Sequence, residues 1–110
     1  MVIPKDALIP ETKIRDYLLI PLRKSDKSKY LSLAGYNRED YWELIRDIRQ
    51  QLLPAEGTFE ERKPDGELYR TIGELTGPNG RKLRIKTVWL RKWTGEWRFI
   101  TLLPDRKPQR

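Results

Sequence analysis

The hydrophobic pattern of this 110-residue chain changes its period at Gly57. Before Gly57, apolar residues recur at the three- and four-residue spacing of helices, most clearly over residues 37–53. After it, short alternating segments are separated by turns rich in Gly and Pro. Helices followed by strands are typical of α+β domains, in which helices cover one face of an antiparallel sheet. We therefore predict one domain, with a mainly helical half over 1–56, an antiparallel sheet over 57–104 and a basic tail over 105–110.

Four segments after Gly57 have the residue types and alternation of β-strands. They are predicted over residues 58–62, 68–75, 82–91 and 97–103. Pro and Gly favour turns between them, because Pro presets its backbone dihedral angle and Gly adopts the left-handed conformation. The three turns contain Pro64-Asp65-Gly66, Gly77-Pro78-Asn79-Gly80 and Thr94-Gly95. Such strands form a meander of roughly four strands with helices packed on one face. We expect Trp93 and Trp97 to pair across the last turn, or to stack on nucleic-acid bases.

The helices of the first half are predicted from residues that favour helix starts, as well as from the spacing of apolar residues. Pro10 suits the first turn of a short helix over 11–19. A second short helix is expected over 29–34. Asn37 is a good N-cap for the longest helix, which begins there. Residues 1–10 are expected to be extended, because each Pro in them restricts the residue before it.

Lysine and arginine outnumber aspartate and glutamate by 23 to 16, which gives a net charge of +7. This balance favours a polyanionic partner such as nucleic acid or an acidic protein. A solvated basic surface without a partner is the alternative. No apolar run approaches the roughly 20 residues of a membrane span, and the N-terminus lacks a secretory signal pattern. We expect a cytoplasmic protein that does not engage a membrane.

The chain contains neither Cys nor His. Disulfides, thiolate metal sites and the commonest neutral-pH acid–base are therefore excluded, and we expect no cofactor and no metal. Any catalysis must use Lys, Arg, Tyr, carboxylates or hydroxyls. RNA cleavage remains feasible, because the ribose 2′-OH is an internal nucleophile and cations can stabilise the phosphorane. The composition permits a metal-independent endoribonuclease without containing a motif for one.

The strand predicted over 82–91 has a cationic face. Alternation puts Lys82, Arg84 and Lys86 on one side, with apolar residues between them. Side chains at this spacing lie about 7 Å apart, close to the spacing of phosphates along a single nucleic-acid strand. In the alternative interpretation they are solvated and pair with acidic residues across the sheet, for about 0.2–1 kcal/mol each. Arg70 and Arg98 widen the face if the strand registers agree.

In the same predicted strand, simple alternation puts apolar residues on both faces. If Leu83 and Ile85 face the core, alternation turns Val88 and Leu90 toward the cationic side. Either a bulge near Thr87 reverses the alternation, or the far half of the strand is covered on both faces.

A basic loop, RKSDKSK, occupies residues 23–29 and includes Lys24, Lys27 and Lys29. Such runs are usually solvated connections. Flexible cations can also neutralise phosphates without a fixed geometry, which makes the loop a candidate for nucleic-acid contact.

Particular strings in the chain form a recognisable set: IRDYLL at 14–19, Ser28-Lys29, AGY at 34–36, Tyr69, LTGPNGR at 75–81, RIKTVW at 84–89 and RFIT at 98–101. Together they resemble an uncharacterised family of short bacterial proteins, frequent in cyanobacteria. They are also similar to C-terminal domains of some polymorphic toxins and phage-head-related proteins. The resemblance covers nearly the whole chain and is most specific over 75–89. The link between Lys29 and Gly35 is shorter than in that family.

This resemblance implies a toxin module. The layout of helices followed by strands is similar to ribonuclease toxins of the barnase-like, colicin-type and mRNA-interferase groups, which often lack His. Many free-standing members pair with an acidic antitoxin, and the net charge of +7 is compatible with that partner. The implied function is a toxin-like ribonuclease of a toxin–antitoxin pair. The alternative is a non-catalytic nucleic-acid- or protein-binding module that uses the same face.

For a ribonuclease, the candidate catalytic residues are Lys29, Arg84, Lys86, Thr87 and Arg98, and the candidate nucleic-acid-binding residues are Arg70, Lys82, Lys24 and Lys27. In this hypothesis Arg84 and Lys86 neutralise the scissile phosphate and Thr87 positions it. Lys29 transfers a proton or clamps a phosphate, and Arg98 is a second phosphate ligand.

Overall fold

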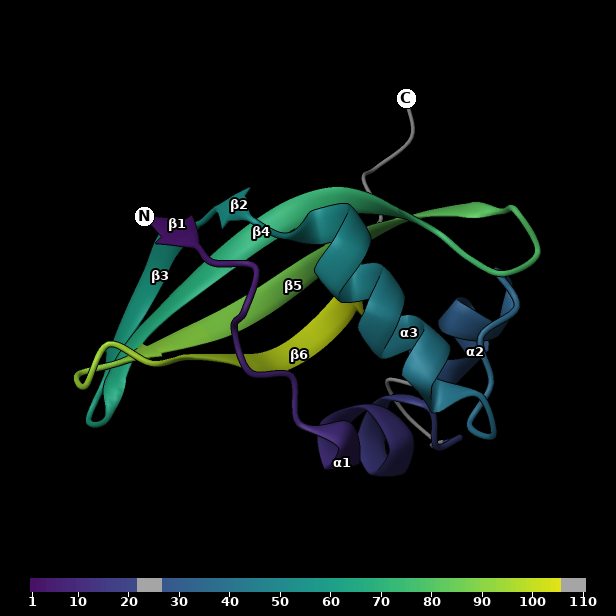
Figure 1. Ribbon diagram of the computed structural model, residues 1–110, viewed down its shortest axis with the longest axis horizontal. Coiled ribbons are helices and arrows are strands. Elements are labelled where there is room, and N and C mark those ends of the chain that lie inside the picture. Colours follow the sequence, from purple (N-terminus) through teal and green to yellow (C-terminus); the bar gives the residue numbers. More distant parts are fainter. Residues whose placement is uncertain (22–26, 106–110) are drawn as a thin grey trace.

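The computed structural model describes residues 1–21 and 27–105 and confirms the α+β prediction (Figure 1). Its main sheet has four antiparallel strands in the order β3-β4-β5-β6, which is the predicted meander. The strands are β3 (Thr58–Lys63), β4 (Gly66–Thr76), β5 (Lys82–Lys92) and β6 (Trp97–Pro104). A second, two-stranded sheet pairs β1 (Val2–Ile3) with β2 (Ala55–Glu56).

The helices are short, and two of them end in a π-helical turn. They are α1 (Glu11–Lys13) with η1 (Ile14–Leu18), α2 (Lys27–Ser32), and α3 (Tyr41–Asp47) with η2 (Ile48–Leu52). The longest helix therefore begins at Tyr41, and the predicted start at Asn37 is wrong. Asn37 instead closes a turn before the helix, since its Oδ1 accepts a hydrogen bond from the backbone N–H of Asp40 at 2.8 Å. Within the described residues, no helix is both long and apolar enough to cross a membrane.

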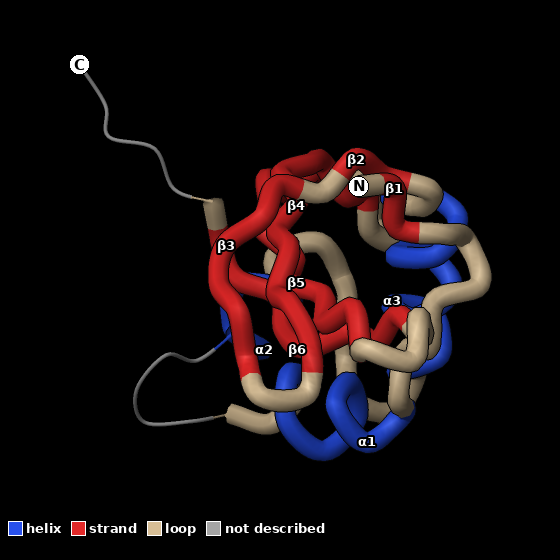
Figure 2. Tube along the Cα trace, turned by 90° about the vertical axis from the view of Figure 1, so that its left-hand side faces the viewer, coloured by secondary structure: helices blue, strands red, loops and turns tan. Residues whose placement is uncertain are grey.

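The core lies between the sheet and α3 with η2, which cover one face of it (Figures 1 and 2). Leu44 and Ile48 are fully buried there against inward-facing residues of β4, β5 and β6. Trp89 and Phe99 meet edge to face, with ring centroids 5.3 Å apart. Burial of large apolar side chains on this face is what holds the helices to the sheet.

Strand β5 keeps its alternation from end to end, so Leu83, Ile85, Thr87 and Trp89 all face the core. Val88 and Leu90 lie on the other face and are also buried. Of the two interpretations left by the sequence, coverage on both faces is therefore the correct one. The bulge is in β6, because Val88 opposes Thr101 whereas Trp89 opposes Phe99.

The last hairpin does not contain the expected tryptophan pair. Trp93 is half exposed, and its Nε1 donates to the carbonyl oxygen of Pro64 at 2.8 Å. Trp97 is buried and packs on the ring of Tyr69, 5.3 Å between centroids. Trp97 opposes Arg91 in the register, which leaves Trp93 in the turn itself.

The turn after β4 packs against the end of the α2 segment. A Cβ on Gly77 would lie 2.2 Å from the carbonyl oxygen of Ala34, so only glycine fits. The backbone N–H of Asn79 donates to the same carbonyl at 3.2 Å, and its side chain donates to the Leu33 carbonyl at 3.0 Å. The string 75–81 thus joins the sheet to α2.

A buried hydroxyl–carboxylate pair links α3 to the sheet side of the core. Tyr36 donates its hydroxyl hydrogen to Asp47 Oδ2 at 2.6 Å, and Arg46 Nε lies 3.1 Å from Oδ1. Both Tyr36 and Asp47 are buried. Burial, reinforced by the bond to Asp47, raises the pKa of the Tyr36 hydroxyl.

We predict that Tyr36→Phe lowers the free energy of unfolding by about 1–3 kcal/mol, because it leaves a buried carboxylate oxygen without its donor. Urea denaturation measures the change. Tyr41→Phe is the matched control, since it removes an exposed hydrogen bond to Glu11 and should cost less. Equal losses in the two variants would contradict the importance of the buried pair.

Candidate nucleic-acid interface

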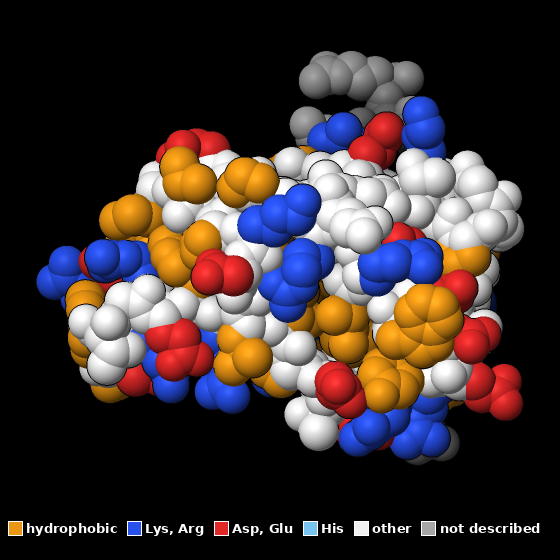
Figure 3. Space-filling model, in the orientation of Figure 1, with side chains coloured by type: hydrophobic (Ala, Val, Ile, Leu, Met, Phe, Trp, Pro, Cys, Tyr) orange, Lys and Arg blue, Asp and Glu red, His pale blue; other side chains and the backbone are white. Residues whose placement is uncertain are grey.

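The face of the four-stranded sheet opposite α3, here called the open face, carries the cationic stripe. Alternation along β5 puts Lys82, Arg84 and Lys86 on it, followed by Val88. The register places Arg70 of β4 directly opposite Val88, and Arg98 of β6 opposite Leu90. All five expected strand cations therefore share one face. The other side of the molecule, which includes α3, carries interspersed basic, acidic and apolar side chains (Figure 3).

The five cations do not converge on one point. Arg98 lies beside Leu90, and Leu90 is six positions along β5 from Arg84, which is about 20 Å along a strand. Arg70 and Lys86 occupy the middle of the face, in neighbouring rows of the register. The stripe is therefore long enough for several phosphates of an extended strand, and its centre is the part where cations from two strands meet.

A carboxylate that the sequence did not indicate lies at this centre. The register of β3 with β4 shifts between Phe59 and Glu61, a bulge that accommodates Glu60. Its Oε2 lies 3.3 Å from Lys86 Nζ and 3.7 Å from an Arg70 guanidinium nitrogen. The signal in the sequence is the Glu60-Glu61 pair, which breaks the alternation of the strand.

A second ion pair occupies one end of the stripe. Arg84 lies 3.0 Å from the carboxylate of Asp105. These pairs fit the solvated interpretation of the stripe, but partly exposed pairs of this kind stabilise a fold by only about 0–1 kcal/mol. A polyanion can therefore replace the carboxylates at little cost. Within the described residues, Lys82 and Arg98 form no ion pair.

Lys27, at the start of α2, is the buried cation of this region, with 8% of its surface exposed. Its Nζ donates to the Tyr17 hydroxyl at 3.1 Å and to Thr101 Oγ1 at 3.0 Å. The ammonium also lies 4.8 Å from the centre of the Tyr17 ring. Over residues 1–21 and 27–105, no carboxylate pairs with it. Because Thr101 opposes Val88, this ammonium reaches the open face from the β6 edge.

The remaining expected residues lie elsewhere. Thr87 is buried on the core face, where its hydroxyl contacts Thr71 Oγ1 and accepts a hydrogen bond from Trp89 Nε1 at 2.8 Å. It therefore does not join Arg84 and Lys86. Lys29 is exposed on α2. Lys24 falls outside the described residues.

A hollow of about 410 Å³ adjoins the open face at the end near Arg98. It is lined by Pro10, Thr12, Lys13, Asp65, Leu90, Lys92, Arg98 and Ile100. Three of these side chains are cationic and one is acidic, so the hollow extends the basic surface toward α1. No group of three potential metal ligands occurs in the described part of the chain.

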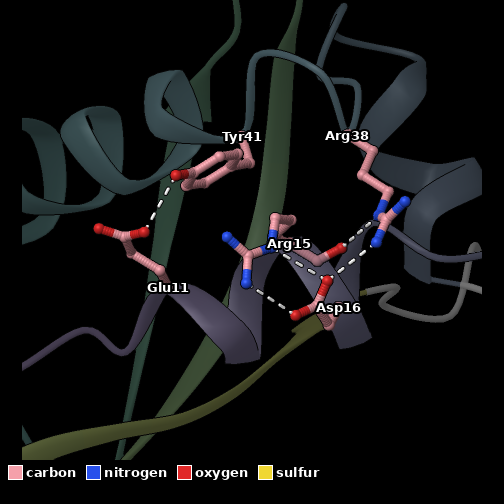
Figure 4. A network of polar contacts seen from close by, with 5 residues as sticks. All are labelled: Glu11, Arg15, Asp16, Arg38 and Tyr41. Carbon is pink, nitrogen blue, oxygen red and sulfur yellow. Dashed lines mark hydrogen bonds and ion pairs between the residues drawn. The ribbon is translucent and has the colours of Figure 1, made fainter.

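A separate polar cluster joins η1 to the segment before α3 (Figure 4). The carboxylate of Asp16 lies 3.0 Å from Arg15 and 2.9 Å from Arg38, and the Arg38 Nε donates to the Arg15 carbonyl. Hydrogen bonds from Arg15 and then Arg38 lower the pKa of Asp16 from 3.8 to about 2. Since one carboxylate engages both guanidinium groups, we interpret the cluster as a structural clasp rather than a binding site.

Comparisons with known proteins place the chain in a family and find a solved structure of similar fold. A family model described as a domain of unknown function, DUF6883, matches residues 4–106. The chain belongs to the DUF6883 family. No curated protein matches it. This DUF6883 domain is similar to a chain in a solved contact-dependent growth inhibition toxin–immunity protein complex from Klebsiella pneumoniae 342. The TM-score is 0.63 at 15% identity, over 90% of this chain and 100% of the other. At that identity the likeness concerns the fold alone.

We predict an acid-dependent contribution of the Asp16 clasp to stability. Because the folded pKa lies below the ordinary value, the contribution is present above about pH 4 and is lost as the pH falls through about 2. Thermal unfolding of Asp16→Asn should therefore be less pH-dependent over this range than that of the wild type. Asp6→Asn is the control for a generic charge effect. Parallel curves for the wild type and Asp16→Asn would contradict the role of the clasp.

Proposed function

We propose that this protein is a toxin-associated, metal-independent endoribonuclease that acts in the cytoplasm and binds RNA phosphates on the open face. The observation that carries the proposal is the alignment of Lys82, Arg84 and Lys86 along β5, with Arg70 and Arg98 on the same face from neighbouring strands. The likeness in fold to a chain of a toxin–immunity complex supports the toxin association.

The spacing of the cations favours RNA in an extended conformation. Successive cations on one strand face lie about 7 Å apart, which allows each to meet a different phosphate of a single strand. In the proposal, Lys86 and Arg70, which meet at the centre of the face, bind the phosphate nearest the reaction. Arg84, Lys82 and Arg98 bind the neighbouring phosphates. Lys24 and Lys29 provide further phosphate contacts. Thr87 is left out, because its hydroxyl is engaged within the core.

The chemistry available to these residues suits RNA rather than DNA. A 2′-OH can attack its own phosphate, so the protein must orient the phosphate and stabilise the added negative charge. Guanidinium and ammonium groups do the second task without a metal ion or a histidine.

A protein that neutralises this toxin forms part of the same proposal. The solved relative is named as part of a toxin–immunity protein complex. With a net charge of +7, the present chain is suited to an acidic inhibitor that covers the open face and excludes RNA from it.

The second candidate function is a non-catalytic module that binds nucleic acid or protein on the same face. The ion pairs of Lys86 with Glu60 and of Arg84 with Asp105 favour it, because they already partly neutralise the stripe. Purified protein incubated with total RNA separates the two functions. Cleavage products support the ribonuclease, and salt-sensitive binding without products supports the module.

We predict that the double variant Arg84→Ala/Lys86→Ala folds normally and no longer arrests growth when its synthesis is induced. In RNA-binding measurements, the slope of log affinity against log salt should fall by roughly 0.7 for each phosphate that the variant no longer neutralises.

The matched control is Arg62→Ala/Lys63→Ala. It removes the same charge and also breaks two surface ion pairs, near the β3–β4 turn. Its toxicity and salt slope should stay close to those of the wild type. Full toxicity of the Arg84→Ala/Lys86→Ala protein would exclude the open face as the site.

A further inference from the structure

Two ionisable side chains flank the centre of the open face from opposite sides. Glu60 approaches from β3, with its carboxylate beside Lys86 and Arg70. Lys27 approaches from α2, with its ammonium on Thr101. Val88 lies between them on β5, since it opposes both Arg70 and Thr101 in the register.

The position of Glu60 differs from that of an ordinary counter-ion on a strand. It occupies the bulge between Phe59 and Glu61, so the irregularity of β3 is what brings this carboxylate to the two cations. Its side chain is only partly exposed, at 27%. A phosphate bound by Lys86 and Arg70 would therefore lie directly beside a carboxylate that can accept a proton.

The environment of Lys27 is unusual in a different way. A buried ammonium is costly unless charges or several polar groups surround it. Lys27 is held instead by two neutral hydroxyls, from Tyr17 and Thr101, and by the face of the Tyr17 ring. An ammonium has three N–H donors, and the bonds to Tyr17 and Thr101 within the described residues use two of them.

The two groups contact residues of one row of the sheet, which runs from Arg70 through Val88 to Thr101. Arg70 and Thr101 are two strand spacings apart, roughly 10 Å across β5. In-line cleavage needs a base near the attacking oxygen and an acid near the leaving oxygen, each within about 3 Å of its partner, on opposite sides of phosphorus. Glu60 lies on the β3 side of this row and Lys27 on the β6 side, so a phosphate held between them has one group on each side.

We propose that Glu60 and Lys27 are the general base and the general acid of RNA cleavage on this face, an assignment that rests on the proposed ribonuclease function. The 2′-OH transfers its proton to Glu60 while its oxygen forms a bond to phosphorus. The phosphorus–O5′ bond breaks, its electron pair stays on O5′, and Lys27 gives that oxygen a proton. The products are a 2′,3′-cyclic phosphate and a 5′-hydroxyl. Proton exchange with water restores both side chains.

The base is tested with Glu60→Gln, which keeps the size of the side chain. Cleavage should fall by about 10²- to 10⁴-fold, whereas RNA affinity should stay equal or increase because a negative charge is lost. The acidic limb of the pH–rate profile should disappear, which loss of a mere counter-ion would not cause. Glu61→Gln is the control, since Glu61 pairs with Lys63. Wild-type cleavage by Glu60→Gln would overturn the assignment.

The acid is tested with Lys27→Arg and Lys27→Met, after thermal unfolding has shown that each variant folds. Arginine keeps the charge but does not release its proton, so a phosphate clamp would survive Lys27→Arg and a general acid would not. If arginine does not fit the buried position, Lys27→Met carries the test alone. Lys63→Met is the control for loss of one lysine charge outside the proposed site.

A modified substrate distinguishes the two roles. An RNA with sulfur in place of O5′, at a site that the wild type cleaves, has a leaving group that needs no proton. This substrate should restore cleavage by the Lys27 variants and leave the Glu60→Gln defect in place. Failure to rescue the Lys27 variants would exclude Lys27 as the acid. Absence of RNA cleavage by the wild type would overturn both the proposed function and this assignment.

Discussion

Burial of β5 on both faces is the constraint on which the rest of this structure depends. Its core face carries Ile85 and Trp89, against which α3 and η2 pack. Its open face changes from cations at Lys82–Lys86 to the buried Val88 and Leu90. A central strand of this kind must be covered at one end and can meet solvent at the other. The proposed site lies at this boundary, where cationic and apolar residues of one strand meet.

Much of the fold follows from local sequence, and the rest follows from contacts between distant segments. The turns at 64–66 and 77–80 fix the meander, because Pro restricts its own φ and Gly adopts conformations and close approaches that other residues do not allow. The predicted start of α3 is too early, since an Asn that closes a turn and an Asn that caps a helix look alike in sequence. The burial of Lys27 could not be predicted either, because both hydroxyls that hold it come from other elements.

The candidate site is predictable only in part for the same reason. Alternation within one strand is sufficient to put Lys82, Arg84 and Lys86 together, and the registers then add Arg70 and Arg98. Thr87 is one position out of phase with its neighbours, and alternation alone already assigns it to the core face. The position of Glu60 could not be predicted, because a bulge in an edge strand leaves little trace in the sequence. Here the trace is two consecutive acidic residues, Glu60 and Glu61.

The packing of the Gly77 turn on Ala34 has a consequence for the opposite end of α2. That short helix is anchored by the turn at its C-terminal side and by the bonds of Lys27 to Tyr17 and Thr101 at its first residue. Both ends of α2 are therefore held against the sheet, one through the 77–80 turn and the other through Thr101 of β6. A substitution in the 77–80 turn that shifts α2 is therefore expected to displace the Lys27 ammonium from Thr101 as well.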